Sequence, residues 1–401
     1  VYKITSINNT ALLGGSTFIY GDNITVHDCI FDGNNATLRG GGLNVYGNNC
    51  TVHDVEVSDN NAGHEGGAVY VKGNGATFYD VTSINNTASR GGSTFIEGND
   101  ATVYDCILDG NKALYNGTEG SGRGGGLDIA GDDCHVHGLD VSDNYADREG
   151  GAVYIKTSNL YIYDIESDNN SAERGGSVFI EGNNITVADS VFNNNKAIFN
   201  ESRNETSGIG GAIDITGDDC KFINVTSVNN TAYRGGSTFV RGDNTVIKDC
   251  ILDNNTATLR GGGLNIAGDK CTIENVDVSN NKAGLMGGAI YVNSNGTTLT
   301  NVIANNNTAE RGGAAFINGT NIIVTGGELN NNKAIFNESN PDESGLGGAF
   351  DIVGDKIIVD GVHTNNNTAY RGGSSFIRGD NVTVQNCNLD FEPLLQVIQN
   401  E

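Results

Sequence analysis

The chain has 401 residues, with 58 Gly, only 2 Pro, no Trp and a formal net charge of −26. Acidity of this size repels phosphate along the whole molecule, which excludes nucleic acid as a partner. No run of 18 or more apolar residues occurs, so we expect no membrane insertion.

A glycine pair opens the same phrase fourteen times, from Gly14 to Gly372, and ten of the thirteen intervals are 25 or 26 residues long. A fixed period of this size is typical of a solenoid, in which each unit buries its apolar face against its neighbours. Residues 1–13 match the second half of a unit and predict an incomplete first coil. Residues 14–390 predict one elongated repeat domain.

Each unit contains three short stretches in which apolar and polar residues alternate. In the first stretch of one unit, Leu43 and Val45 flank Asn44, so the two aliphatic side chains point inward and Asn44 points outward. Alternation with period two predicts strands. We therefore expect an all-β fold, a single right-handed parallel β-helix (β-solenoid) of about fourteen coils with three strands per coil. Helical repeats are the competing interpretation, but the chain lacks apolar residues at three- and four-residue spacing.

Every coil ends in Asn-x-Ala, which predicts an internal ladder of identical asparagines. A buried amide must be satisfied, and copies one strand spacing apart can donate to and accept from each other. The predicted ladder residues are Asn9, Asn34, Asn60, Asn86, Asn111, Asn144, Asn170, Asn195, Asn230, Asn255, Asn281, Asn307, Asn332 and Asn367.

Charges alternate just before the glycine pair, as in Arg39, Glu65 and Arg90. Opposite charges in successive coils predict ion pairs that follow the axis and set the register of the coils.

Six of the eight cysteines fall in adjacent coils, as Cys29 with Cys50, Cys106 with Cys134 and Cys250 with Cys271. Disulfides between coils are one interpretation, provided that the Cα atoms lie within about 7 Å. The alternative is that each cysteine fills a small slot in the core.

Three coils carry insertions at the same corner, at residues 114–123, 198–209 and 335–346. Insertions on one edge often mark the binding face of a solenoid, and tolerated loop length is the simpler account.

The outward position of the first strand carries an aromatic residue in most coils. Such a row predicts either a lateral protein contact, which we favour, or a platform for sugar rings. The stripe comprises Phe18, Tyr70, Phe95, Tyr154, Phe179, Phe239, Tyr291, Phe316 and Phe376, and it is interrupted by Asn44, Asp128, Asp214, Asn265 and Asp351.

No catalytic constellation emerges from the sequence, because we find no group of acids that breaks the repeat at one place. Calcium is a candidate cofactor at Asp132, Asp133, Asp218 and Asp219, for which a solvated turn is the simpler account. A metal site at His27, His53 and His137 lacks a further ligand. We therefore expect no enzyme, no catalytic residue, no metal site and no cofactor, with calcium in these turns as the one alternative.

Export is indicated by nineteen Asn-x-Ser/Thr sequons. These candidate N-glycosylation sites are Asn8, Asn23, Asn35, Asn49, Asn85, Asn116, Asn169, Asn184, Asn200, Asn204, Asn224, Asn229, Asn254, Asn295, Asn306, Asn318, Asn337, Asn366 and Asn381. Because Asn and Thr are abundant, chance accounts for part of this number.

The tail 391–401 fits no repeat position and predicts a cap or a docking segment. An incomplete first coil predicts head-to-tail contact with another copy, since unpaired strand edges are adhesive. The expected partners are therefore copies of the chain itself, end to end and side by side, with glycans as a further class.

The phrases GGAV, GGAI and GGAF, followed by an aliphatic-x-x-Asn such as Val57 to Asn60, resemble the repeats of chlamydial polymorphic outer membrane proteins. They are still more similar to adhesin-like surface proteins of methanogenic archaea with a pectate-lyase-like β-helix. This resemblance implies surface structure or adhesion. We expect a non-enzymatic protein of the extracellular cell surface that forms a layer, sheath or filament. An adhesin that binds glycans or another cell is the alternative, and a polysaccharide lyase or hydrolase is the third choice.

Overall fold

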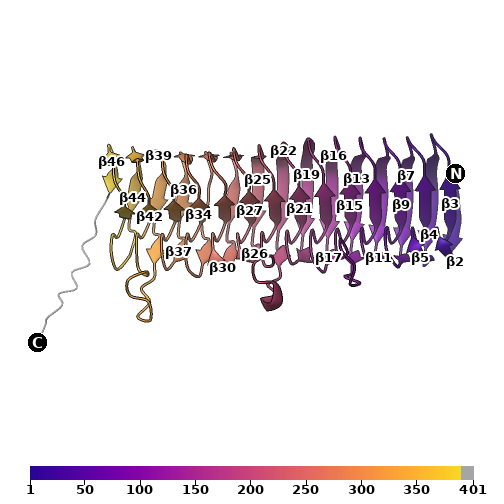
Figure 1. Ribbon diagram of the computed structural model, residues 1–401, viewed down its shortest axis with the longest axis horizontal. Coiled ribbons are helices and arrows are strands. Elements are labelled where there is room, and N and C mark those ends of the chain that lie inside the picture. The colour runs from indigo at the N-terminus through magenta and orange to yellow at the C-terminus, as the bar shows by residue number, and fades with distance from the viewer. Residues whose placement is uncertain (390–401) are drawn as a thin grey trace, which may run out of the picture.

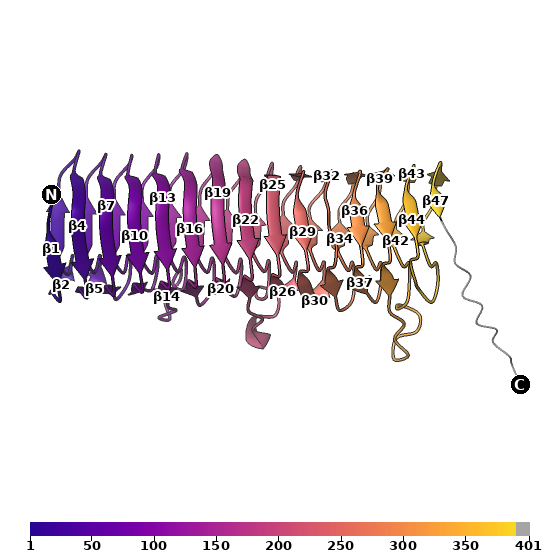
Figure 2. The same ribbon diagram turned by 180° about the vertical axis from the view of Figure 1, so that it is seen from behind.

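The computed structural model describes residues 1–389, which form one right-handed parallel β-helix (Figure 1). The predicted fold class is confirmed. Each coil contributes a strand to each of three long parallel sheets, here named A, B and C. Sheet C faces the viewer in Figure 1 and sheet A in Figure 2, and the short strands of sheet B form the lower edge in both views.

Sheet A has sixteen strands. They are β1 (Thr5–Ile7), β4 (Thr25–Asp32), β7 (Thr51–Ser58), β10 (Thr77–Ile84), β13 (Thr102–Asp109), β16 (His135–Ser142), β19 (Leu160–Asp168), β22 (Ile185–Asn193), β25 (Lys221–Val228), β28 (Val246–Lys248), β29 (Ile251–Asp253), β32 (Thr272–Glu274), β35 (Thr298–Thr300), β39 (Ile322–Thr325), β43 (Ile357–Asp360) and β46 (Val382–Gln385). A separate four-stranded sheet comprises β36 (Ile303–Asn305), β40 (Glu328–Asn330), β44 (His363–Asn365) and β47 (Asn388–Leu389).

Sheets B and C have thirteen and fourteen strands. Sheet B comprises β2 (Thr10–Leu13), β5 (Asn35–Arg39), β8 (Asn61–Ala62), β11 (Thr87–Ala88), β14 (Lys112–Ala113), β17 (Tyr145–Ala146), β20 (Ser171–Ala172), β23 (Lys196–Ala197), β26 (Thr231–Arg234), β30 (Thr256–Arg260), β33 (Lys282–Ala283), β37 (Thr308–Ala309) and β41 (Lys333–Ala334). Sheet C comprises β3 (Thr17–Tyr20), β6 (Leu43–Tyr46), β9 (Val69–Lys72), β12 (Thr94–Glu97), β15 (Leu127–Ala130), β18 (Val153–Lys156), β21 (Val178–Glu181), β24 (Ile213–Thr216), β27 (Thr238–Arg241), β31 (Leu264–Ala267), β34 (Ile290–Asn293), β38 (Ala315–Asn318), β42 (Phe350–Val353) and β45 (Ser375–Arg378).

The glycine pair is required because the chain passes very close to the next coil at this corner. Gly40 has φ of +62°, a left-handed conformation in which residues with a Cβ are strained. A Cβ on Gly41 would lie 2.1 Å from the carbonyl oxygen of Gly67 in the following coil. The recurring pair is therefore a geometric requirement of the stacked corner.

The interior contains a continuous apolar core of Val, Ile, Leu, Phe, Ala and Cys side chains. Beside it, the structure places the fourteen predicted asparagines in one file, which is buried from Asn34 to Asn332. Asn60 Oδ1 accepts from both the backbone N and Nδ2 of Asn34, each at 3.0 Å. Asn60 Nδ2 in turn donates to Asn86 Oδ1 and to the carbonyl of Phe31. These bonds satisfy the buried amides and tie each coil to the next.

The cysteines of the described residues are free thiols, so the predicted disulfides are not formed. Cys29 pairs in register with Val55, and Cys50 lies five residues before Val55 in the same coil. Five strand residues span on the order of 15 Å, well beyond the reach of a disulfide. Burial raises the pKa of the Cys50 and Cys106 thiols to about 12, which makes them unreactive core residues.

The three insertions project from the edge formed by sheet B, as Figures 1 and 2 both show. The second contains the 3-10 helix η1 (Glu201–Arg203). Each loop is tied back by a sequon asparagine: Asn116 Nδ2 donates to Ser89 Oγ, Asn200 Nδ2 to Glu173 and Asn337 Nδ2 to Glu310.

Within residues 1–389 no helix has the length and apolarity to cross a bilayer. The predicted tail at 391–401 lies outside the described residues.

Candidate functional site

The aromatic stripe of sheet C points away from the core, but most of it is not exposed as expected. Tyr70 and Tyr154 are fully buried and Phe95 is 2% exposed, whereas Phe18, at the first coil, is 47% exposed. Arginines from the neighbouring corner cover the rings: the guanidinium of Arg39 lies 5.0 Å from the ring centre of Tyr70. Because cations and π-faces attract each other, these arginines form a lid over the stripe.

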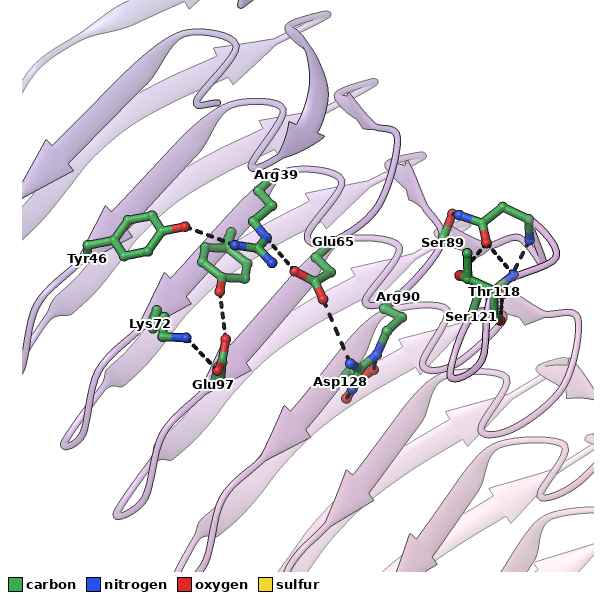
Figure 3. Close-up of polar contacts among 12 residues, drawn as sticks. Arg39, Tyr46, Glu65, Lys72, Ser89, Arg90, Glu97, Thr118, Ser121 and Asp128 are labelled. Atoms are coloured by element: carbon green, nitrogen blue, oxygen red, sulfur yellow. Dashed lines mark hydrogen bonds and ion pairs between the residues drawn. The ribbon is translucent and has the colours of Figure 1, made fainter. Parts of the chain in front are cut away.

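A network of ion pairs and hydrogen bonds holds this lid in place (Figure 3). Arg39 Nε donates to Glu65 at 2.6 Å, and its Nη1 donates to the Tyr46 hydroxyl at 3.0 Å. Arg90, which covers the ring of Phe95, donates from Nε to Asp128 Oδ2 at 3.0 Å. The stacking of opposite charges predicted from Arg39, Glu65 and Arg90 is therefore present.

The same arrangement recurs along the rod at the other acidic positions of the stripe. Arg174 contacts Asp214 at 2.7 Å, and Arg311 contacts Asp351 at 2.6 Å. All three aspartates are fully buried. Burial, opposed by Arg90, raises the pKa of Asp128 to about 6. Since no substrate can reach these carboxylates, the outward face of sheet C is a closed layer that stabilises the rod.

The outward face of sheet A is open, and seven aromatic rings are stacked along it. We call this row the ring ladder: Tyr2, His27, His53, Tyr79, Tyr104, His137 and Tyr163. Neighbouring ring centres lie between 4.6 and 5.5 Å apart, and the planes diverge by at most 14°. Every ring is exposed or half-buried.

The ladder follows from register. Tyr79 pairs with His53 on one side and with Tyr104 on the other, at the same position of β7, β10 and β13. Parallel strands lie about 4.8 Å apart, which is close to the spacing of the rings. Residues that repeat in register are therefore forced into one continuous aromatic surface parallel to the axis.

Carboxylates flank the ladder on one side. The residue after each ring is Asp in every coil from β4 to β19 except one, and it adopts positive φ, as at Asp105 (φ 51°), where the strand bends. A short polar side chain tolerates this conformation. We call the exposed carboxylates of these strands the acid strip: Asp28, Asp54, Glu56, Asp80, Asp105, Asp140, Asp164 and Glu166.

The repeat is interrupted at Gly138, which replaces the aspartate in β16. A hollow of about 230 Å³ lies here, lined by Asp105, Asp140, Asp164 and Glu166. A Cβ at position 138 would lie 2.4 Å from Asp105 Oδ1, so only glycine leaves room for that carboxylate at its observed position. Four carboxylates from three successive coils therefore border one hollow where the repeat is broken, and the sequence did not predict this group.

On the other side of the ladder lie threonines, for example Thr77 and Thr102, which pair in register. His27 Nδ1 lies 2.9 Å from Asp28, and His53 Nδ1 lies 2.7 Å from Asp54. Desolvation, together with Tyr79, Asp105 and Asp80 nearby, raises the pKa of the Tyr104 phenol. The face thus combines flat rings with hydroxyl groups and carboxylates.

The proposed calcium residues lie apart from this face, in the turn after sheet C. Asp132 Oδ1 accepts from the backbone N of Ser158, and Asp133 Oδ1 accepts from Asn159 Nδ2. Nowhere in residues 1–389 do three or more His, Cys, Asp or Glu side chains form a group suited to a metal ion. His27, His53 and His137, considered as metal ligands from the sequence, are members of the ring ladder.

Sequence reasoning missed the ring ladder although its signal is present. Tyr79, Tyr104 and Tyr163 occupy the unit position of the three histidines, so the whole column could have been aligned from the repeat. The alternation of strands predicts which side chains point outward. It does not predict which of them a neighbouring arginine covers.

No protein-family model matches the sequence, and no curated protein is significantly similar to it. Solved structures with this fold include the A-module of the mannuronan C-5 epimerase AlgE6 of Azotobacter vinelandii, at 12% identity with a TM-score of 0.47, covering 91% of this chain and 90% of that one. The periplasmic alginate epimerase AlgG has 7% identity and a TM-score of 0.45, covering 86% and 77%. PfbA, a surface adhesin of Streptococcus pneumoniae, has 11% identity and a TM-score of 0.32, covering 89% of each chain. These similarities show the fold alone.

Two predictions are corrected by this finding. A non-enzymatic layer, sheath or filament protein is contradicted, because the solved proteins that share the β-helix are epimerases and an adhesin. The prediction that the chain is not an enzyme is corrected as well, because the fold on which it rested also occurs in epimerases and therefore does not exclude catalysis. The structure adds a physical reason against the first: most of the aromatic residues assigned to lateral contacts are buried under arginines.

Proposed function

We propose that this chain is an extracellular, surface-associated protein that binds a polysaccharide along the ring ladder of sheet A. The observation that carries the proposal is the row of seven stacked, accessible rings parallel to the axis. The rings stack on one another, so their outward edges form a rigid apolar ridge, against which the apolar faces of sugar rings can pack at low entropic cost. A polymer of repeating units suits a surface that repeats once per coil.

The polar groups beside the rings support the same function. Threonine hydroxyls donate and accept hydrogen bonds, and carboxylates accept charge-assisted ones from sugar hydroxyls. The rings provide apolar contact area, and the flanking polar groups fix the orientation of the ligand, as is usual in ligand sites. The resemblance to adhesin-like proteins of methanogenic archaea and to chlamydial outer membrane repeats supports adhesion at a cell surface.

The test removes rings from the ladder. Tyr79→Ser combined with Tyr104→Ser should weaken binding to the polysaccharides that the unmodified chain retains, by on the order of 100-fold, since aromatic contacts contribute about 0.5 to 1.5 kcal/mol each beyond their buried area. The matched control is Tyr20→Ser, because Tyr20 is 85% exposed and lies outside the ladder. Binding is measured on a glycan array and by calorimetry. Equal binding by the double variant and the control would overturn the proposal.

The carboxylates around Gly138 favour hydrolysis of a bound glycan as a second candidate function. Asp140 and Glu166 are paired in register on adjacent strands, so their backbones lie about 5 Å apart. Retaining glycosidases separate two carboxyl groups by roughly 5 Å. Glu166→Gln should abolish the release of reducing ends from a retained polysaccharide and keep most of its binding, which the ring ladder provides. Intact polysaccharide after long incubation with the unmodified chain contradicts this candidate function.

A further inference from the structure

We propose that the polysaccharide bound along the ring ladder carries free amino groups, as in a deacetylated amino-sugar polymer. This inference rests on the proposed function and deepens it. Charge complementarity supports it, because carboxylates line the face on which the outward edges of the ring ladder provide apolar contact area for sugars.

The acid strip has no basic counterpart. β4, β7, β10, β13, β16 and β19 contain no Lys or Arg at all. Among the ion pairs of residues 1–389, none joins a member of the strip to Lys or Arg, and only the two ladder histidines contact it. On sheet C, by contrast, the carboxylates of Asp128 and Glu65 are matched by arginines. The negative charge beside the ladder is therefore left for a ligand to neutralise.

The charge is also periodic. Asp54, Asp80 and Asp105 follow one another in successive coils, each beside its own ring and each exposed. The separation between neighbours is about 4.8 Å along the axis. A polymer with an ammonium group on each of its sugars presents charge at regular intervals along the same line, whereas a polyuronate is repelled along the whole face.

The hollow at Gly138 fits an ammonium group. Asp105 and Asp164 flank it from coils two rungs apart, and Asp140 and Glu166 border it on the adjacent column. An ammonium group has three donors and no acceptor, and the carboxylates offer only acceptors. His137 is stacked between Tyr104 and Tyr163 at this level, so the outward edges of three rings lie beside the hollow and can contact the sugar that carries the ammonium.

The experiment compares fully deacetylated chitosan oligosaccharides with chitin oligosaccharides of equal length, by calorimetry near pH 6 at two salt concentrations. We expect the amine form to bind at least about tenfold more tightly, and its advantage to shrink at higher salt. Equal or tighter binding of the acetylated form overturns the inference but leaves the proposed function intact. Binding of neither form, with no other glycan retained, defeats both.

Charge variants assign the effect to named residues. Asp105→Asn combined with Asp164→Asn should weaken chitosan binding on the order of tenfold and chitin binding much less, because Asn still accepts hydrogen bonds from hydroxyl groups but no longer attracts an ammonium group. The backbone tolerates this change, because Asn224, Asn275 and Asn301 occupy the same bend at positive φ in later coils. Asp249→Asn is the matched control, with the same bend and charge but beyond the ladder. Equal losses in the pair and the control would overturn the assignment.

A basic peptide and a polyuronate complete the comparison. If oligolysine binds as tightly as chitosan and Tyr79→Ser does not weaken oligolysine binding, the acid strip binds basic peptides. The inference of an amino-sugar ligand is then wrong. Retention of alginate oligosaccharides at the ladder would likewise overturn it. Weak oligolysine binding that is lost at moderate salt, beside chitosan binding that needs Tyr79, supports it.

Discussion

Two columns of aromatic residues run along this rod, one on sheet C and one on sheet A, and their surroundings differ completely. Tyr70 and Tyr79 belong to the same coil, yet Tyr70 is fully buried and Tyr79 is accessible. Arg39 lies over Tyr70, whereas Tyr79 is stacked between the rings of His53 and Tyr104 and, in the part of the chain that the structure describes, no arginine covers its outward edge. The comparison teaches that an outward position becomes a binding surface only where no long side chain from the adjacent corner covers it.

Removal of one arginine from the sheet C lid has the largest expected effect on stability. Arg90→Ala should lower the free energy of unfolding by about 3 to 5 kcal/mol, because it leaves the buried Asp128 carboxyl without its partner. Chemical denaturation measures the change. Lys156→Ala on the same sheet serves as the control, since its ion pair with Glu181 is exposed and contributes less than about 1 kcal/mol. Similar losses in the two variants would show that the lid is not a buried ionic layer.

Tyr70 and Tyr79 lie in the same coil, and we expect their replacement to affect stability to different extents. Tyr70→Ser should destabilise the chain by about 3 kcal/mol, because it empties a buried site and frees Glu97 from a 2.7 Å hydrogen bond. Tyr79→Ser should lower the free energy of unfolding by about 1 kcal/mol at most, because its ring stacks at the surface. Melting temperatures of the two variants, measured side by side, give the result. Equal melting temperatures would mean that both rings experience the same environment, contrary to the structure.

The third prediction concerns pH. The pKa of Asp128 is raised to about 6 in the folded chain, so its favourable contribution is complete below its unfolded pKa of 3.8 and is lost as the pH rises through 6. Asp128→Asn does not titrate. We expect the stability of this variant relative to the unmodified chain to increase between pH 4 and pH 7 by on the order of 2 to 3 kcal/mol. Urea denaturation across this range tests it, and a difference independent of pH contradicts it.

Much of the fold was predictable because the repeat constrains it. A period of 25 or 26 residues, inward aliphatic pairs such as Leu43 and Val45, and an Asn-x-Ala at every corner leave few ways to satisfy both the apolar residues and the amides. The choice between disulfides and core slots for the cysteines needed the structure, in which Cys29 pairs in register with Val55 and Cys50 lies five residues earlier in that coil. The binding face was missed because coverage by arginine depends on where a corner residue of one coil reaches over the next.

The amino-acid sequence by itself determined the coil, its register and the inward or outward direction of each strand residue, because strand alternation and the corner glycines are local properties. Only the tertiary structure decided which outward residues are accessible. It stacked Tyr79, Tyr104 and Tyr163 with the histidines of other coils, closed the arginine lid over Tyr70 and Phe95, and gathered four carboxylates around Gly138. Coverage depends on contacts between residues 25 or more positions apart, and no single repeat contains that information.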